Sequence, residues 1–144
     1  MGRLLAIDYG ARRVGLALSD PLKMIASPYR TIINEGNSNL IMEIERIIAA
    51  EDVEQTIIGF PLGMAGQITE QTKKVKEFAV KLIARGIEIE YEDERWSSVA
   101  AKRSMKEQNI KSGYNKELVD QTAAAIFLQQ YLCLLYTSPS PRDA

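Results

Sequence analysis

The order of hydrophobic patterns along the chain restricts its fold more than any other feature of the sequence. Residues 3–9 are a nearly continuous apolar run, and residues 13–20 form a second run after a short turn, so the two together predict a β-hairpin. Residues 24–33 predict a third strand, and Pro28 places that strand near the edge of a sheet. Apolar side chains at helical spacing over residues 40–50 predict the first helix.

The second half of the chain alternates between strand and helix patterns. Residues 53–59 predict a fourth strand, and the helix that follows ends at Gly86. Residues 87–91 alternate apolar side chains with glutamates, which predicts a half-buried strand with its glutamates in solvent. Two further helices are predicted over residues 97–108 and 116–132. The resulting order, β-β-β-α-β-α-β-α-α, is that of an α/β fold.

The C-terminal residues do not continue the helical pattern. Residues 133–144 read CLLYTSPSPRDA, which looks like translated adapter or vector sequence joined to an open reading frame. We therefore predict one domain, residues 1–132, followed by a tail that is not native to it. The alternative is a genuine disordered tail.

Histidine is absent from the 144 residues, and this absence excludes whole classes of active site. Ser-His-Asp catalysis, Cys-His catalysis and histidine-ligated zinc are all ruled out. The single cysteine allows no internal disulfide, and the N-terminus shows no secretory pattern, so a cytoplasmic protein is expected. No membrane partner is expected, because the longest apolar stretch, residues 123–128, is too short to span a bilayer. A hydrolase of this composition must use carboxylates, lysines, hydroxyls or metal ions held by oxygen.

Two aspartates occupy positions that the surrounding pattern marks as buried. Asp8 lies inside the first apolar strand, where an unpaired carboxylate needs a counter-charge or a cation. The alternative for Asp8 is an ion pair with Arg12 or Arg13, just beyond the turn. Asp120 shares one helical face with otherwise apolar side chains, so it points towards the core. Its alternative is an aspartate of the first helical turn that stabilises the helix dipole.

A third acid lies where the glutamate-rich strand ends. Strict alternation selects Asp93 as the inward side chain, whereas a twist or bulge at the strand end would select Glu94. Three acids from separate elements would hold divalent metal, and two Mg²⁺ ions roughly 3.5–4 Å apart would support phosphodiester hydrolysis. That chemistry needs no histidine.

Charge is segregated in the second half of the chain although the net charge is only -1. Residues 95–116 carry six basic side chains and one acid, and residues 88–94 carry five acids and no base. A basic face beside an acidic pocket suits a polyanion held near metal-binding carboxylates. The alternative is that both are ordinary solvated faces.

Four motifs, in their order and spacing, resemble the signatures of the YqgF/RuvX family and extend over residues 1–132. They are Ile7-Asp8-Tyr9-Gly10 with residues 13–20, Gly59-Phe60-Pro61-Leu62 with Gly66, residues 93–98 (Asp-Glu-Arg-Trp-Ser-Ser), and residues 120–132. The resemblance implies an RNase H-like fold, with a mixed five-stranded sheet and helices on both faces, in a bacterial cytoplasmic nuclease. It implies a role in ribosome biogenesis, the processing of the 5′ end of precursor 16S rRNA. The alternative activity is Holliday-junction resolution.

The resemblance also implies which side chains form the site. Asp8, Glu94 and Asp120 match the family's acids, so Glu94 is preferred to Asp93 as the third catalytic and metal-binding residue. The expected cofactor is Mg²⁺ or Mn²⁺, as two ions. The side chains expected to contact nucleic acid are Arg12, Arg13, Arg95, Lys102 and Lys111.

Several alternatives remain for the partners and the activity. Structured RNA is the expected partner and branched DNA the alternative, and a monomer or weak homodimer is expected because no conspicuous apolar patch marks a dimer interface. The chain departs from the family at Gly63 and Ala65, which removes side-chain hydrogen bonds near the expected substrate edge. An ATP-binding domain of the actin-like type is a rival, but it would need a second such domain to enclose the nucleotide. A non-catalytic RNA-binding assembly factor is the other rival, and the three acids argue against it.

Overall fold

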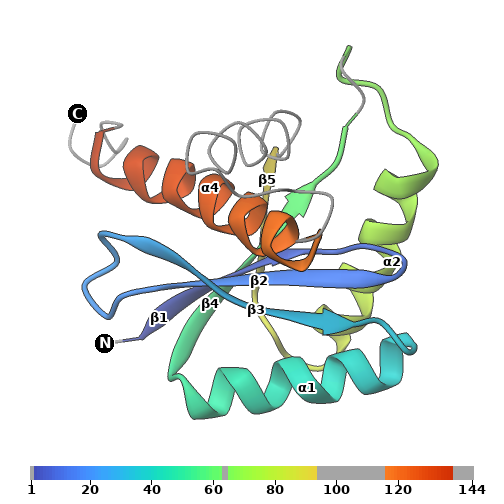
Figure 1. Ribbon diagram of the computed structural model, residues 1–144, viewed down its shortest axis with the longest axis horizontal. Coiled ribbons are helices and arrows are strands. Elements are labelled where there is room, and N and C mark those ends of the chain that lie inside the picture. Colours follow the sequence, from blue (N-terminus) through green and yellow to red (C-terminus); the bar gives the residue numbers. More distant parts are fainter. Residues whose placement is uncertain (1, 63–64, 94–115, 138–144) are drawn as a thin grey trace.

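A computed structural model describes residues 2–62, 65–93 and 116–137 of the chain (Figure 1). The helix predicted over residues 97–108 lies outside the described residues. The described elements are β1 (Arg3–Asp8), β2 (Arg13–Ser19), β3 (Ala26–Ile33), α1 (Asn37–Ala50), β4 (Val53–Phe60), α2 (Glu70–Ala84), β5 (Ile89–Asp93) and α4 (Lys116–Thr137).

The strands form one mixed sheet in the order β3-β2-β1-β4-β5. β1 pairs antiparallel with β2, and β2 pairs antiparallel with β3. β4 pairs parallel with β1 on one side and with β5 on the other. The predicted hairpin and the predicted mixed five-stranded sheet are confirmed. β3 is an edge strand, which explains how Pro28 is accommodated in it.

Helices cover both faces of this sheet, with α1 and α2 on one side and α4 on the other (Figure 1). Alternate residues of β1 supply the two cores, because successive side chains of a strand point to opposite faces. Leu5 and Ile7 face α1 and α2, whereas Leu4 and Ala6 face α4. Burial of β1 on both faces accounts for its nearly continuous apolar sequence.

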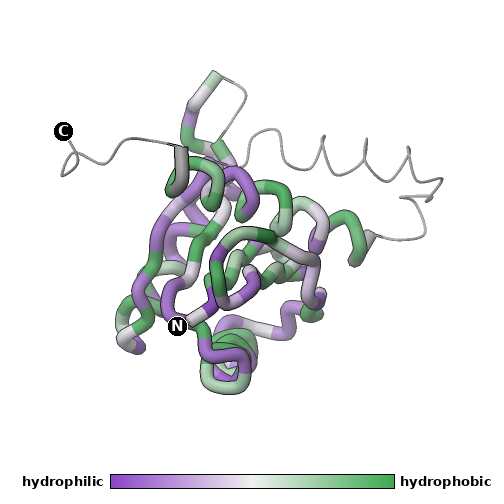
Figure 2. The backbone as a smooth tube through the Cα atoms, turned by 90° about the vertical axis from the view of Figure 1, so that its left-hand side faces the viewer, coloured by the Kyte–Doolittle hydropathy of each residue, from purple (hydrophilic) through white to green (hydrophobic). Residues whose placement is uncertain are grey.

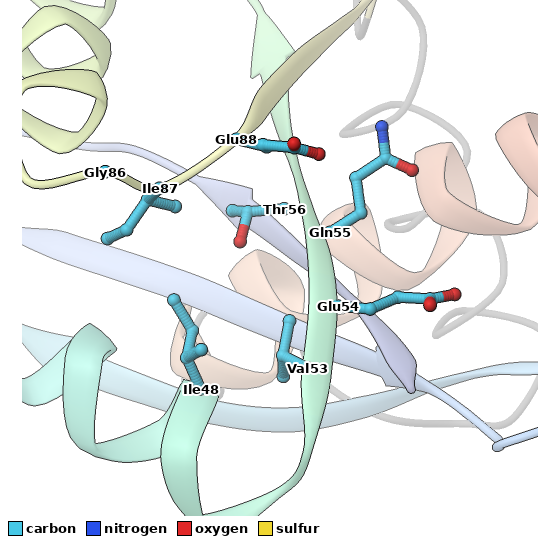
Figure 3. Close-up of a pocket in the computed structure, with 8 residues that line it drawn as sticks. All are labelled: Ile48, Val53, Glu54, Gln55, Thr56, Gly86, Ile87 and Glu88. Carbon is cyan, nitrogen blue, oxygen red and sulfur yellow. The ribbon is translucent and has the colours of Figure 1, made fainter. Parts of the chain in front are cut away.

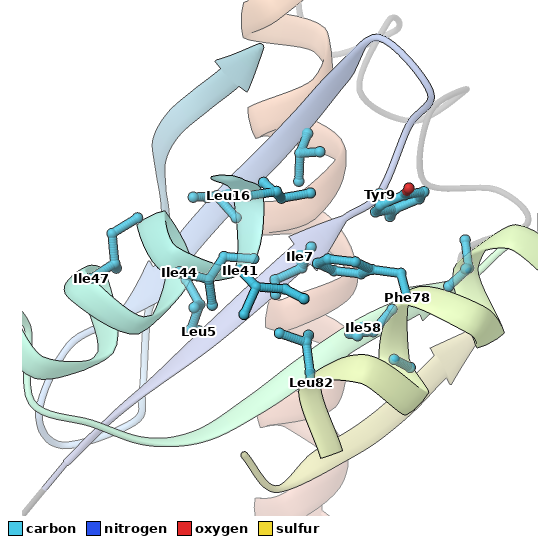
Figure 4. Close-up of a cluster of buried hydrophobic side chains, with 14 of the residues drawn as sticks. Leu5, Ile7, Tyr9, Leu16, Ile41, Ile44, Ile47, Ile58, Phe78 and Leu82 are labelled. Atoms are coloured by element: carbon cyan, nitrogen blue, oxygen red, sulfur yellow. The ribbon is translucent and has the colours of Figure 1, made fainter. Parts of the chain in front are cut away.

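The core between the sheet and the first two helices is the larger of the two clusters that flank the sheet (Figure 4). Tyr9 stacks on Phe78 of α2 with the ring centroids 4.5 Å apart. The Tyr9 hydroxyl donates a hydrogen bond to Asn37 Oδ1 at the start of α1, over 2.8 Å. Tyr9 thus links both helices to the strand end at which Asp8 lies.

Hydrophobic and hydrophilic residues are interleaved along the chain rather than gathered in one segment (Figure 2), because each element presents only part of its surface to a core.

α4 is longer than the sequence pattern predicts. It runs to Thr137, past the predicted end at residue 132, so the first part of the predicted tail is helical. Leu132 is buried, whereas Leu134 and Leu135 are 51% and 52% exposed, so this last part of the helix adds little to the core. Residues 118–135 are long and apolar enough by composition to cross a membrane. The buried side of the helix nevertheless packs on the sheet, as in the core helix of a globular domain.

Candidate active site

Asp8 is the last residue of β1 and lies at the carboxyl end of the central strand of the sheet. Leu4 and Ala6 precede it on the same side of the strand and pack with side chains of α4. Alternation therefore places Asp8 on the face that α4 covers. Asp8 is half-buried and interacts with other groups of the protein.

Gly15 of β2 lies opposite Asp8 in the antiparallel register. α4 passes so close over Gly15 that a Cβ atom there would be 2.8 Å from the Cβ of Asp120, and closer still to the Asp120 carbonyl group. Opposed residues of antiparallel strands have Cα atoms about 4.5–5.5 Å apart. Asp8 and Asp120 are thereby brought to neighbouring positions on one face of the sheet, although most of the chain separates them in sequence.

Arg13 begins β2 and lies on the same face as Gly15, two residues further on. The Arg13 Nε donates a hydrogen bond to Oδ2 of Asp120 over 2.9 Å, and the two side chains are 30% and 24% exposed. The sequence suggested Arg13 as an ion-pair partner of Asp8. Arg13 makes an ion pair with Asp120, because α4 lies over this end of β2 and brings the Asp120 carboxylate to the guanidinium.

Asp93 lies on the opposite side of the sheet from Asp8. It pairs with Phe60 at the end of β4, and Tyr91, on the same side of β5, makes an edge-to-face contact with Phe60 at 5.0 Å between ring centroids. Strict alternation correctly gives Asp93 the face of Tyr91, but that face belongs to α1 and α2. Glu94, the preferred third acid, lies outside the described residues.

Glu92 is an acid that the sequence pattern assigned to solvent and that the structure places on the Asp8 face. Gly59 of β4 pairs with Glu92, and the β1–β4 register continued by one residue pairs Gly59 with Asp8. Asp8, Gly59 and Glu92 therefore follow one another across three adjacent strands. Partial burial, and to a lesser extent the charge of Asp93, raises the pKa of the Glu92 carboxyl above its ordinary value.

The position of Glu92 could not be read from alternation alone. α4 covers this face of β5, so the alternating pattern separates two covered faces rather than a buried face from solvent. Tyr131 of α4 lies near the glutamates of β5. Burial, and then the charge of Glu90, raises the pKa of the Tyr131 hydroxyl. The expectation of helices on both faces was the signal that could have identified Glu92.

The donor chemistry of the site fits a hard divalent cation. Asp8 and Asp120 supply carboxylate oxygens, the donors that Mg²⁺ and Mn²⁺ prefer, and the chain has no histidine to favour zinc. Over residues 2–62, 65–93 and 116–137, no group of three acidic, histidine or cysteine side chains is close enough to hold a metal ion. Glu94, the third acid predicted from the sequence, lies outside those residues.

The basic residues expected to contact nucleic acid are only partly described. Arg12 is exposed in the turn between β1 and β2, where its carbonyl oxygen accepts a hydrogen bond from the Asn34 N–H over 2.8 Å. Arg13 follows it at the site. Arg95, Lys102 and Lys111 lie outside the described residues, as does Gly63. Ala65 is exposed, and its N–H donates a hydrogen bond to Gln67 Oε1 over 3.0 Å.

A pocket of about 300 Å³ lies near the beginning of β4, away from Asp8 and Asp120 (Figure 3). Ile48, Val53 and Ile87 form its apolar wall, and the buried hydroxyl of Thr56 has no hydrogen-bond partner among the described residues. Thr56 precedes Gly59 by three residues, about 10 Å along a strand, and lies on the face of α1 and α2. This pocket is separate from the carboxylate site.

Comparison with known proteins places the chain in a family. The model of the RuvX family, described as a Holliday junction resolvase, matches residues 2–133. The chain belongs to the RuvX family. The RuvX match includes Asp8, Arg13 and Asp120 together with the predicted third acid, Glu94. The resemblance drawn from the four sequence motifs is thereby confirmed.

Curated relatives support the same assignment at substantial identity. A protein of Agathobacter rectalis is 39% identical over 142 residues, which covers 96% of this chain and 99% of the relative. A protein of Bacteroides thetaiotaomicron is 41% identical over 136 residues (92% and 96% of the two chains), and one of Crocosphaera subtropica is 40% identical over 129 residues (89% and 90%). Each carries the name "Putative pre-16S rRNA nuclease".

Solved structures share the fold at much lower identity. RuvC of T. thermophilus in complex with a Holliday junction substrate matches with a TM-score of 0.59 at 11% identity, covering 96% of this chain and 98% of that one. The resolvase of Fowlpox virus in complex with Holliday junction DNA matches with a TM-score of 0.58 at 10% identity, covering 94% and 99%. The predicted RNase H-like fold is confirmed.

Proposed function

We propose that this protein is a cytoplasmic, metal-dependent nuclease that processes the 5′ end of precursor 16S rRNA. The observation that carries the proposal is the close passage of α4 over Gly15, which brings Asp120 beside the strand position of Asp8. The choice of substrate rests on the relatives, each of which is named "Putative pre-16S rRNA nuclease". Structured RNA is the expected partner, and the protein acts as a monomer or weak homodimer.

The site residues divide into two groups by their chemistry. Asp8, Glu94 and Asp120 would hold Mg²⁺ or Mn²⁺, as two ions. Bound ions of this kind lower the pKa of a water molecule and stabilise the leaving oxygen of a phosphodiester. The exposed Arg12 and the partly exposed Arg13 lie at the same end of the sheet, where their cationic side chains would hold the RNA backbone.

A side-by-side incubation with two substrates tests this proposal. Purified protein is incubated with precursor 16S RNA and with a four-way DNA junction, in Mg²⁺ and after addition of excess EDTA. We expect cleavage of the RNA near its 5′ end in Mg²⁺, no cleavage in EDTA, and recovery when Mn²⁺ is added back. Cleavage of the junction but not of the RNA would favour the resolvase alternative. Binding of RNA without any cleavage in either metal would favour the assembly-factor alternative.

A pair of substitutions tests the choice between the adjacent acids. We expect Glu94→Gln to lower the rate of RNA cleavage about 100-fold, as loss of a charged group at a transition state does. Asp93→Asn is the matched control and is expected to change the rate less than about twofold, because Asp93 lies on the α1 and α2 side of the sheet. Single-turnover cleavage assays on both variants measure the difference. The reverse pattern would assign the third position to Asp93.

A further inference from the structure

The ion pair between Arg13 and Asp120 occupies one of the acids that the proposed function gives to metal. The Arg13 Nε lies 2.9 Å from Oδ2 of Asp120. The backbone geometry fixes this contact at both ends, since Gly15 brings the Asp120 backbone against β2 and Arg13 precedes Gly15 by two residues on the same face. Asp120 thus carries an internal counter-ion.

A guanidinium in this position opposes metal binding. Arginine keeps its positive charge at any physiological pH, so the contact with Asp120 is not released by deprotonation. A divalent cation that approaches Asp120 must compete for the same carboxylate and is repelled by the arginine charge. Loss of the Arg13 contact would leave a more negative site for the metal.

The contact is not needed to hold α4 on the sheet. Both side chains are partly exposed, at 30% and 24%, and ion pairs of this exposure stabilise a fold only weakly. The helix is anchored instead by fully buried side chains, among them Phe127 and Leu128, packed on the residues of β1 and β4. A purely structural role for the pair would therefore be redundant.

A nucleic acid phosphate is the natural second partner for Arg13. The planar guanidinium presents five N–H donors in a fork that matches phosphate oxygens, whereas the contact with Asp120 uses Nε. Arg13 is one-third exposed and lies at the end of the sheet beside the acids. A substrate held for cleavage at those acids brings its phosphates to this place.

We propose that Arg13 is an exchangeable counter-ion, which neutralises Asp120 in the free protein and transfers to a substrate phosphate when metal and RNA bind. This inference rests on the proposed function, because it takes Asp120 as a metal ligand. It makes Arg13 a positioning residue that couples the two binding events. Metal favours RNA and RNA favours metal to the same extent, since a coupling free energy is reciprocal.

Titration of Mn²⁺ without RNA tests the first half of the exchange. Mn²⁺ binding is measured by electron paramagnetic resonance for the wild type, Arg13→Gln and Arg46→Gln. We expect Arg13→Gln to bind Mn²⁺ about three- to tenfold more tightly. Arg46→Gln removes the same charge from α1, on the opposite face of the sheet, where the side chain is 69% exposed, and is expected to change the affinity less than about twofold. Equal or weaker Mn²⁺ binding by Arg13→Gln would overturn the inference.

Binding of RNA tests the second half. In Ca²⁺, used so that cleavage does not interfere, we expect Arg13→Gln to bind precursor RNA more weakly and to reduce the slope of log affinity against log salt by about one. Mn²⁺ affinity of the wild type should rise when RNA is present, and this coupling should be lost in Arg13→Gln. An unchanged coupling would show that Arg13 is only a structural contact.

Two further controls separate the possible failures. Wild-type Mn²⁺ binding that is insensitive to Asp8→Asn would overturn the proposed metal site and this inference with it. Binding that Asp8→Asn abolishes and Arg13→Gln leaves unchanged would overturn the inference alone. If Arg13→Gln does not fold, as judged by circular dichroism, Arg13→Met takes its place. Methionine also removes the charge while keeping an extended apolar side chain, and equal or weaker Mn²⁺ binding by Arg13→Met would overturn the inference.

Discussion

Replacing Asp8 by asparagine is expected to lower the rate of RNA cleavage by on the order of 10³-fold while leaving the fold intact. Asp8 ends the central strand and lies opposite Gly15, over which α4 places Asp120, so the proposed function makes it the central acid of the site. Asparagine keeps the shape of the side chain but removes its negative charge, and with it most of the affinity for divalent metal. Single-turnover cleavage at saturating Mg²⁺ measures the loss.

A matched aspartate shows whether the loss is local. Asp52, exposed at the other end of the sheet, has a left-handed backbone with a φ of 53°, which asparagine also tolerates. Asp52→Asn therefore removes one carboxylate charge at no structural cost, and its cleavage rate should stay within about twofold of the wild type. Thermal unfolding should show both variants folded. Cleavage by Asp8→Asn at more than about a tenth of the wild-type rate would remove Asp8 from the site.

The sequence pattern predicted the sheet well because its strands carry strong and different signals. β1 reads as a continuous apolar run because it is the central strand and is covered on both faces. β3 carries Pro28 because it is an edge strand. The end of α4 was predicted less well, since residues 133–135 extend the helix with exposed side chains that no burial pattern requires.

The sequence names candidate residues for the site but not their contacts. Asp8 and Asp120, which the structure places on one face of the sheet, stand out because a carboxylate in an apolar pattern is conspicuous. The ion pair of Asp120 with Arg13 was not predicted. No local sequence pattern indicates that α4 crosses β2 at Gly15, which places Asp120 beside Arg13. Glu92 was missed for a related reason, because alternation does not reveal which faces a distant helix covers.

Gly15 is the residue on which this convergence depends, and Gly15→Ala is expected to destabilise the fold by about 3 kcal/mol. The new Cβ would lie 2.8 Å from the Cβ of Asp120 and closer to its carbonyl group, so the backbone of α4 would have to move away from β2. That movement would open the packing around Ala124 and Phe127 and displace Asp120 from Asp8. Chemical denaturation measures the stability, and cleavage by the folded fraction should fall as well.

Gly86→Ala separates the cost of the contact from the cost of losing a glycine. Gly86 has a φ of 84°, and a Cβ there would meet nothing within 4 Å, so its substitution carries backbone strain of about 1 kcal/mol and no clash. We expect Gly15→Ala to cost clearly more than Gly86→Ala and to be the only one of the two that lowers activity. Equal costs would mean that α4 shifts freely over β2. The fold would then not depend on the close contact between α4 and Gly15 that brings Asp120 near Asp8.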